Sequence, residues 1–186
     1  AGSVAMSSAA ESEHGEVAVT AQKDITSSAA INAGTNVTLS STNGDITSSG
    51  AVTAGQKVEV ETAEGNVILN GTVTSANGEV DVTAKGPVTT NAAIQAGIDV
   101  TLFSKNDAVS VKDTVTAMSG NVNVTAQGAV ETYKEIYGGT DVTLWSKNAN
   151  VLAKETVTAD TGEIMVKAVT GISAAKALDA GTNVTL

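Results

Sequence analysis

A short apolar motif recurs along the whole chain at nearly constant intervals, and this repeat limits the possible fold more than any other feature. The motif has the form G-x(1–2)-[V/I]-x-[V/L], and its first apolar residue recurs every 20–22 residues. The positions are Val17, Val37, Val58, Val80, Val100, Val122, Val142, Ile164 and Val184. Fixed periods of this length are typical of solenoids, in which each repeat is one structural unit stacked on the next.

Each repeat contains two further apolar positions, and together the three predict three short strands. The second position follows the first by eight or nine places, at Ile25, Ile46, Val67, Val88, Val109, Val130, Val151 and Ile172. The third follows the first by fourteen or fifteen places, at Ile31, Val52, Val73, Ile94, Val115, Ile136, Val157 and Leu178. β-Branched residues that alternate with Thr and Asn, and that are bounded by Gly, Asn, Ser and Lys, indicate strands and turns rather than helices.

Strands with only one or two inward residues are too short to form an independent hairpin. Stacking of equivalent rungs solves this problem, because each strand then has partners about 4.8 Å above and below it. The residue two places after the first apolar position is aliphatic in every repeat, and the residue between is mostly polar, as inward and outward positions require. We therefore predict an all-β fold, a right-handed parallel β-helix (β-solenoid) with three strands and about 20–22 residues per rung.

The predicted solenoid is a single segment, residues 1–186, of about 8–9 rungs. Residues 7–14 do not fit the repeat, and we expect them to form a surface loop before Val17, with Val4 in the third strand column and His14 on the loop. The chain stops within an apparent strand at Leu186, so we interpret it as an excerpt of a longer chain. A Gly two or three places before each first apolar position indicates a turn with positive φ or close backbone approach.

Composition removes several classes of function. Twenty carboxylates, ten Lys and no Arg give a net charge of −10, which disfavours nucleic-acid binding. The absence of Cys excludes disulfides and Cys-based zinc sites, and one His leaves no His-rich metal centre. No run of about 18 apolar residues exists, so we expect no helical membrane insertion. We also predict no cofactor. We predict no enzymatic activity, because Arg is absent and no Ser or Lys is paired with His in any column.

The repeat also resembles a known family. The phrase AGTNVTLSSTNGDITSSGAVTAG (residues 33–55) and later repeats such as GGTDVTLWSKN are similar to the repeat region of filamentous haemagglutinin-like exoproteins. These bacterial surface adhesins are exported by two-partner secretion and include contact-dependent inhibition proteins. The resemblance covers about residues 15–186 and implies a right-handed β-helical shaft, secreted or displayed at a bacterial cell surface. It also implies that receptor-binding or toxin parts lie elsewhere, so the leading hypothesis is a structural shaft that projects such a distal region.

Two alternative functions are compatible with the sequence. Phe103 and Trp145 occupy equivalent outward positions two repeats apart, where they can stack on sugar rings or on a partner protein. Tyr133 and Tyr137 lie on nearby turns and extend this candidate site for a host glycan or surface protein. In the second alternative, uncapped rungs stack end to end, so that the chain pairs with itself in an extracellular filament.

Three further groups of polar residues repeat along the chain. Carboxylates cluster on the outward side of the first strand, where they form either a Ca²⁺ site or a solvated acidic face; these are Glu59, Glu61, Glu79, Asp81 and Asp99. Asp24, Asp45 and Asn66 share one column, for which side-chain bonds to turn backbone are the simplest explanation. Sequons occur at Asn36, Asn70, Asn123 and Asn183, which are therefore candidate glycosylation sites.

Overall fold

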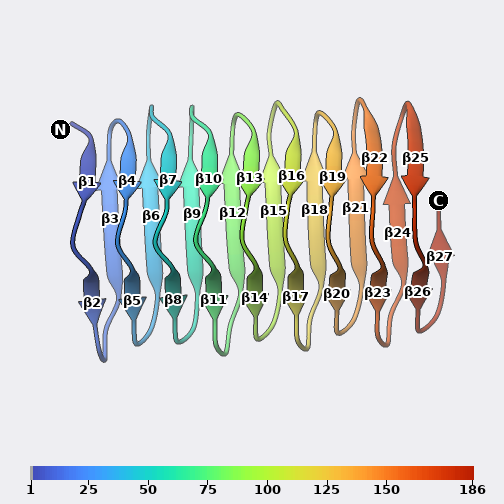
Figure 1. Ribbon diagram of the computed structural model, residues 1–186, viewed down its shortest axis with the longest axis horizontal. Helices are drawn as coiled ribbons and strands as arrows, with labels where there is room; N and C mark the ends of the chain where they lie inside the picture. Colours follow the sequence, from blue (N-terminus) through green and yellow to red (C-terminus); the bar gives the residue numbers. More distant parts are fainter. Residues whose placement is uncertain (1) are drawn as a thin grey trace.

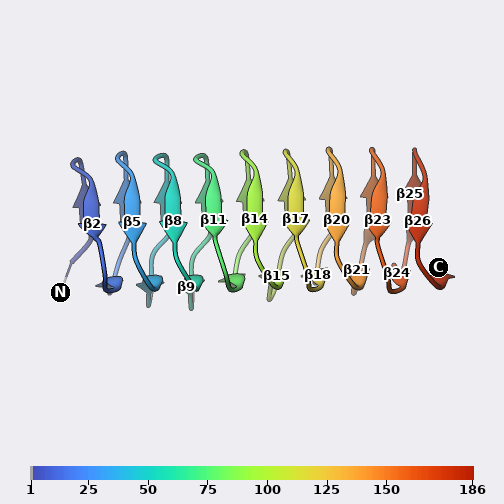
Figure 2. The ribbon, with the colours of Figure 1, turned by 90° about the horizontal axis from the view of Figure 1, so that it is seen from below.

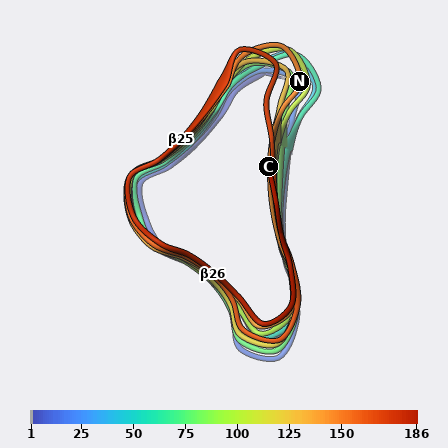
Figure 3. The same cartoon turned by 90° about the vertical axis from the view of Figure 1, so that its right-hand side faces the viewer.

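The computed structural model describes residues 2–186, and these residues form strands and turns without a helix. The chain winds through nine rungs, and each rung contributes one strand to each of three parallel sheets (Figure 1). Figure 3 looks along the axis from the C-terminal end and shows a three-sided cross-section in which successive rungs superpose. The chain runs counter-clockwise as it approaches the viewer, so the solenoid is right-handed. The predicted fold class is confirmed.

The three sheets correspond to the three apolar columns of the repeat. Sheet A holds the second strand of each repeat: β1 (Val4–Met6), β4 (Ile25–Ser27), β7 (Ile46–Ser48), β10 (Val67–Leu69), β13 (Val88–Thr90), β16 (Val109–Val111), β19 (Val130–Thr132), β22 (Asn150–Ala153) and β25 (Gly171–Ala174). Sheet B holds the third strand: β2 (Ala10–Ser12), β5 (Ile31–Ala33), β8 (Val52–Ala54), β11 (Val73–Ser75), β14 (Ile94–Ala96), β17 (Val115–Ala117), β20 (Ile136–Gly138), β23 (Val157–Ala159) and β26 (Leu178–Ala180). Sheet C holds the first strand: β3 (Val17–Ala21), β6 (Val37–Ser41), β9 (Val58–Thr62), β12 (Val80–Ala84), β15 (Val100–Ser104), β18 (Val122–Ala126), β21 (Val142–Ser146), β24 (Ile164–Lys167) and β27 (Val184–Thr185). Figure 2 shows the strands of sheet B following one another along the axis.

The register of the strands is continuous from the first rung to the last. Partners in sheets A and B keep one separation along the sequence, which is the same for the pair Val67–Val88 and for the pair Val73–Ile94. From Val58 onward, partners in sheet C alternate between a shorter separation, as from Val80 to Val100, and a longer one, as from Val100 to Val122, whereas Val37 and Val58 keep the separation of sheets A and B. The alternation arises because the turns on the two sides of sheet C exchange one residue, so the length of the whole rung is unchanged.

The inward columns form one continuous apolar core along the axis. In sheet C, Val37 and Leu39 of one rung lie beneath Val58 and Val60 of the next, and all four are at most 1% exposed. Burial of a Val or Leu side chain contributes about 1.5–3 kcal/mol, so repeated columns of this kind favour stacking over isolated rungs. The alternation of inward aliphatic and outward polar residues is confirmed.

The second inward position of sheet A is mixed, as the sequence indicates, and holds several hydroxyl side chains. Ser27 Oγ donates to the Ala29 carbonyl oxygen at 2.7 Å, within its own turn. Thr90 and Thr132 are fully buried in the same column, but their hydroxyl oxygens have no hydrogen-bond partner in the structure. Val111 lies between these two Thr residues in register and is also fully buried.

The prediction for the start of the chain was wrong. Residues 7–14 are not an inserted loop, because Ala10–Ser12 form β2 and pair with β5. Val4 pairs with Ile25 and therefore belongs to the second strand column rather than the third. Backbone bonds such as the one from Ala10 N–H to the Ala30 carbonyl (3.1 Å) form whatever the side chain is. The rung is therefore regular, but the small Ala10 lacks the large apolar side chain by which the sequence pattern identifies a strand. His14 is exposed in the turn that follows.

The recurrent Gly before the first strand is explained by close backbone approach. The sequence left two explanations, a positive φ or close backbone approach. None of the Gly residues in the described chain has positive φ, so the first explanation is excluded. A Cβ atom on Gly55 would lie only 2.0 Å from the carbonyl oxygen of Gly34 in the rung below. Only hydrogen fits between stacked backbones at this turn.

Candidate functional site

Phe103 and Trp145 lie where the sequence predicts them, in one outward column of sheet C. Phe103 in β15 is in register with Thr125 in β18, which is in register with Trp145 in β21. The two rings are therefore two rungs apart, about 9.6 Å at normal strand spacing. Phe103 is half-buried and Trp145 is 41% exposed. These are the residues around which a binding site can be built.

A lysine that the sequence pattern did not single out lies next to both rings. The Nζ atom of Lys147 is 5.4 Å from the centroid of Phe103 and 5.2 Å from that of Trp145. Both distances are within the range of cation–π attraction, so the ammonium group is held close to the two aromatic side chains. The available signal was the tetrapeptide aromatic-Ser-Lys-Asn, which occurs at residues 103–106 and again at residues 145–148.

The Ser residue of each tetrapeptide fixes the turn that follows the aromatic residue. Ser104 Oγ accepts from Asp107 N–H at 3.0 Å and donates to the Gly86 carbonyl oxygen of the rung below at 2.8 Å. Ser146 makes the equivalent pair of bonds with Ala149 N–H (3.0 Å) and the Gly128 carbonyl (2.8 Å). Both Ser side chains are fully buried. The Lys and Asn of each tetrapeptide therefore project from a turn with a defined shape.

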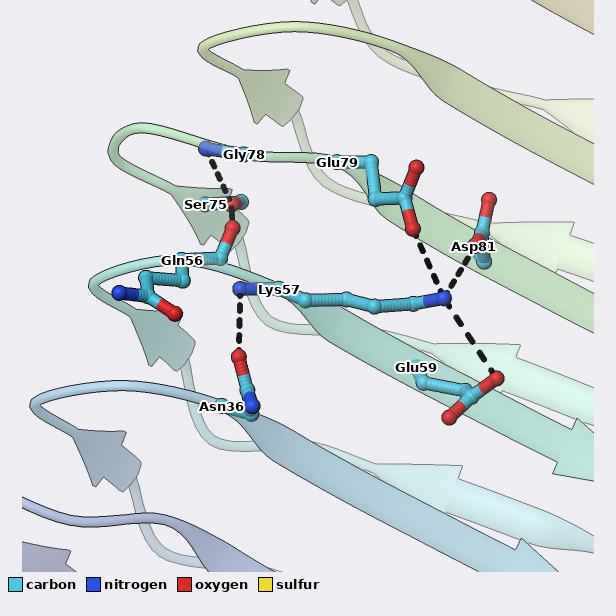
Figure 4. Close-up of polar contacts among 8 residues, drawn as sticks. All are labelled: Asn36, Gln56, Lys57, Glu59, Ser75, Gly78, Glu79 and Asp81. Atoms are coloured by element: carbon cyan, nitrogen blue, oxygen red, sulfur yellow. Dashed lines mark hydrogen bonds and ion pairs between the residues drawn. The ribbon is translucent and has the colours of Figure 1, made fainter.

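Inward hydroxyl residues bridge other turns of the solenoid in the same way. Thr62 Oγ1 accepts from Gly65 N–H at 3.0 Å and donates to the Gly44 carbonyl oxygen at 2.6 Å. At the opposite end of sheet C, Ser75 Oγ accepts from Gly78 N–H at 3.3 Å and donates to the Gln56 carbonyl, as Figure 4 shows. A Ser or Thr at the last inward position of a strand is the sequence signal for these bridging hydrogen bonds, and the sequence analysis did not use it.

Three further Lys side chains project from the same part of sheet C as the rings. Lys105 Nζ lies 3.6 Å from a carboxylate oxygen of Glu61, two rungs below Phe103. Lys85 forms an ion pair with Glu64. Lys167 is the register partner of Trp145 and is exposed. Near the aromatic column, the four Lys residues Lys85, Lys105, Lys147 and Lys167 outnumber the nearby carboxylates Glu61, Glu64 and Asp107 by one, although the chain as a whole carries −10.

Tyr133 and Tyr137 are not part of this site. Tyr133 follows β19 of sheet A, and its ring lies between two Lys ammonium groups, Lys112 at 3.7 Å and Lys154 at 4.0 Å from the centroid. Its hydroxyl donates to Glu131 at 2.8 Å. Tyr137 lies in β20 of sheet B, and the cross-section in Figure 3 places sheets A and B on the two sides away from sheet C. The four aromatic residues therefore form three separate features: the column of Phe103 and Trp145, the Tyr133 ring, and Tyr137.

Three of the five carboxylates predicted to cluster on sheet C lie around one lysine. Lys57 Nζ lies 2.8 Å from oxygens of both Glu79 and Asp81, and 3.6 Å from Glu59 (Figure 4). The Lys57 ammonium donates hydrogen bonds to Asp81 and to Glu79, and these bonds are the main cause that raises the pKa of Lys57 well above its ordinary value. Smaller Coulombic contributions from Asp81 and Glu59 act in the same direction, and together they outweigh the effect of burial.

Among residues 2–186 no group of three or more His, Cys, Asp or Glu side chains has the arrangement of a metal site. The remaining two carboxylates of the predicted cluster lie outside the Lys57 group. Glu61 faces Lys105, and Asp99 Oδ1 accepts from Asn121 N–H at 2.6 Å. The structure therefore replaces one acidic patch with three separate polar arrangements.

Asx side chains form ladders between rungs, as the column of Asp24, Asp45 and Asn66 indicates. Asp24 Oδ1 accepts from Asp45 N–H at 3.0 Å, and Asp45 Oδ1 accepts from Asn66 N–H at 2.8 Å. The prediction of side-chain to backbone bonding is confirmed, although each bond joins one rung to the next. The ladder stops at the next rung, where Pro87 has no N–H to donate.

The four sequons differ in their surroundings. Asn36 is half-buried, and its Oδ1 accepts from Lys57 N–H at 3.2 Å. Asn70 is exposed and accepts from the Asn91 side chain at 2.7 Å. Asn123 points outward from β18 and is half-buried, whereas Asn183 is exposed in the last rung. Glycosylation at these positions stays a prediction.

No family model, curated protein or solved structure matches the chain. The described residues contain no helix that is long and apolar enough to cross a membrane.

Proposed function

We propose that this chain is a stiff structural shaft within a secreted or cell-surface bacterial exoprotein, and that it projects a distal binding or toxin region. The observation that carries this proposal is the unbroken parallel register of three nine-stranded sheets. Every internal strand has a hydrogen-bonded neighbour on each side, so the flanks of the solenoid expose no unpaired strand edge. Bending the rod would require opening ladders in all three sheets.

The stiffness of the rod follows from contacts between neighbouring rungs. Each rung contacts the rung above and the rung below, so stability is a sum of intrinsic rung terms and interface terms. Nine rungs at normal strand spacing correspond to a rod about 40 Å long. The Ser and Asx bonds between successive rungs, such as Ser104 to Gly86 and Asp24 to Asp45, resist twisting of one rung against the next.

The bacterial surface location rests on the similarity of the repeats to filamentous haemagglutinin-like exoproteins. A structural role for this segment agrees with that similarity, because the shaft region in the family separates the functional parts of a long molecule. Direct recognition of a host glycan by the segment is a second candidate function, and the placement of Lys147 close to Phe103 and Trp145 favours it.

The shaft proposal is tested by changing the length of the solenoid without changing its register. Deletion of residues 99–140 from the full-length exoprotein removes two rungs and joins Ile98 to Asp141, which has the same place in the repeat as Asp99. We expect a rod shorter by about 9.6 Å, measured by small-angle scattering or electron microscopy, and a distal region that stays folded but reaches less far. A matched deletion of residues 99–130 removes a non-integral number of rungs and should disrupt the rod. Retention of full function by a protein lacking all nine rungs would contradict the shaft role.

A further inference from the structure

The aromatic-Ser-Lys-Asn tetrapeptides form a two-part arrangement on one edge of sheet C. Residues 103–106 and residues 145–148 occupy the same position in rungs that are two apart. The rung between them has Thr125, Ala126 and Gln127 at the equivalent positions. Aromatic ring, cation and amide are thus repeated together at an interval of about 9.6 Å along the axis.

The repeated groups are held in place before any ligand arrives. The buried hydroxyls of Ser104 and Ser146 bind both their own turns and the rung below, whereas the intervening Ala126 has no such group. The ammonium group of Lys147 lies within cation–π distance of both rings, and therefore near the middle of the interval that separates them. Preorganised groups of this kind lose less conformational entropy on binding.

The free ammonium groups at this edge favour a negatively charged ligand. Lys147 has aromatic rings rather than a carboxylate as its close partners, and Lys167 stands beside Trp145 and forms no ion pair within residues 2–186. Lys105 has one competing carboxylate, Glu61, at 3.6 Å. Asp107 follows the first tetrapeptide and places a carboxylate at this edge, where its Oδ1 accepts from Ala108 N–H at 2.7 Å. Lys85 is paired with Glu64, so Lys147 and Lys167 are the two Lys of this edge without a close carboxylate among residues 2–186.

We propose that this edge binds a linear acidic polysaccharide that lies parallel to the solenoid axis and carries one carboxylate per disaccharide. An extended disaccharide has about the length of two rungs, so chemically equivalent sugar units reach Phe103 and Trp145 together. The pyranose faces pack against the rings, the carboxylates meet Lys105 and Lys147, and the amides of Asn106 and Asn148 bond to hydroxyl groups.

A repeating polymer fits these observations better than a folded protein does. A protein partner presents different groups to successive rungs and has no need for two copies of one contact set at a fixed interval. A polysaccharide presents the same ring, charge and hydroxyl groups each time. Binding at both positions also raises affinity through effective concentration, because the second contact set forms within the same complex.

Binding of hyaluronan oligosaccharides to the 186-residue chain tests the proposal, because hyaluronan carries one carboxylate per disaccharide. Trp145 is the single Trp of the chain, so its fluorescence reports ligand at the proposed position. We expect a saturable fluorescence change, an affinity that falls as ionic strength rises, and much weaker binding of a neutral chito-oligosaccharide of equal length. Calorimetry provides the affinity for variants that lack Trp145.

Substitutions at the edge should change affinity in both directions. Lys105→Ala with Lys147→Ala should weaken binding at least about tenfold, and Phe103→Ala with Trp145→Ala should do the same. Glu61→Gln should strengthen binding, because it frees Lys105 from its carboxylate. The matched control is Lys112→Ala with Lys154→Ala, which removes two Lys with the same two-repeat separation from the Tyr133 corner and should leave affinity unchanged.

Several results would overturn the proposal. Equal affinity for the neutral oligosaccharide would remove the role of charge, and equal weakening by the control pair would indicate nonspecific attraction. Binding of an acidic peptide such as polyglutamate as tight as that of hyaluronan would point to a protein partner. Circular dichroism of each variant separates lost binding from lost folding, and light scattering detects self-association through this face. None of these outcomes depends on the shaft function.

Discussion

Two buried hydroxyls without partners provide a test of the core. Thr90 and Thr132 are fully buried, and their Oγ1 atoms make no hydrogen bond in the described structure. Removal of a hydroxyl from water without a compensating bond costs about 1–3 kcal/mol. Val has the shape of Thr, and Val111 shows that the column between these two residues accepts it. We therefore expect Thr90→Val and Thr132→Val each to raise the free energy of unfolding by about 1 kcal/mol.

The opposite result is expected at Thr62, which is equally buried but fully bonded. Thr62→Val removes the acceptor for Gly65 N–H and the donor to the Gly44 carbonyl, so two backbone groups lose their partners. This change should lower the free energy of unfolding by about 1–3 kcal/mol. The same amino-acid exchange thus has opposite signs at two positions, which general hydrophobicity does not explain.

Urea unfolding followed by circular dichroism and by Trp145 fluorescence measures these differences. The midpoint should rise for the double variant of Thr90 and Thr132, by about twice the single effect, with an unchanged dependence on denaturant. Val111→Thr is the reverse test, since it adds a third unpartnered hydroxyl to the column and should destabilise the chain. Loss of stability on Thr90→Val, or no loss on Thr62→Val, would refute the reasoning.

The remaining predictions concern a turn and the Lys57 cluster. Gly55→Ala should lower the free energy of unfolding by more than about 3 kcal/mol, because its Cβ would lie 2.0 Å from the Gly34 carbonyl oxygen. Gly171→Ala, with no atom within 4 Å of the added Cβ, should change it by less than about 0.5 kcal/mol. Thermal unfolding of the two variants measures the difference. Lys57→Met should destabilise by about 0.5–1 kcal/mol, less at high salt, since it leaves Glu59, Glu79 and Asp81 without their shared cation. Pairing raises the pKa of Lys57 in the folded chain, so its contribution is complete below the unfolded pKa of about 10.4 and disappears as the pH rises through the higher folded value. A stability difference between wild type and variant that is lost well below that pH would contradict the assignment.

The columns of the sequence were sufficient to predict most of the backbone. Period-two alternation around residues such as Val37 and Val58 defines an inward face, and the constant interval aligns those faces in adjacent rungs. The same reasoning placed Phe103 and Trp145 in one outward column. It failed at Ala10, because a small residue gives little hydrophobic signal although its backbone pairs normally.

The lysines show why the candidate site was only half predicted. Strand alternation gives the direction of a side chain at its Cβ atom but does not give the position of an ammonium group at the end of a long, flexible side chain. Lys57 turns toward Glu79 and Asp81 of the next rung, and Lys147 extends toward the rings of Phe103 and Trp145. Both choices depend on residues that are brought near only when the rungs stack.

The amino-acid sequence alone determined the length of the rung, the three strands and the apolar columns, because these depend on local periodicity and on the burial of Val, Ile and Leu. The tertiary structure decided which polar groups from different repeats meet. It joined Ser104 to the Gly86 carbonyl, left Thr90 without a partner, and separated Tyr133 from the aromatic column of sheet C. The physical reason is that hydrogen bonds and cation–π contacts act over a few ångströms. They therefore form only when the stacking of rungs brings polar groups from different repeats within that distance.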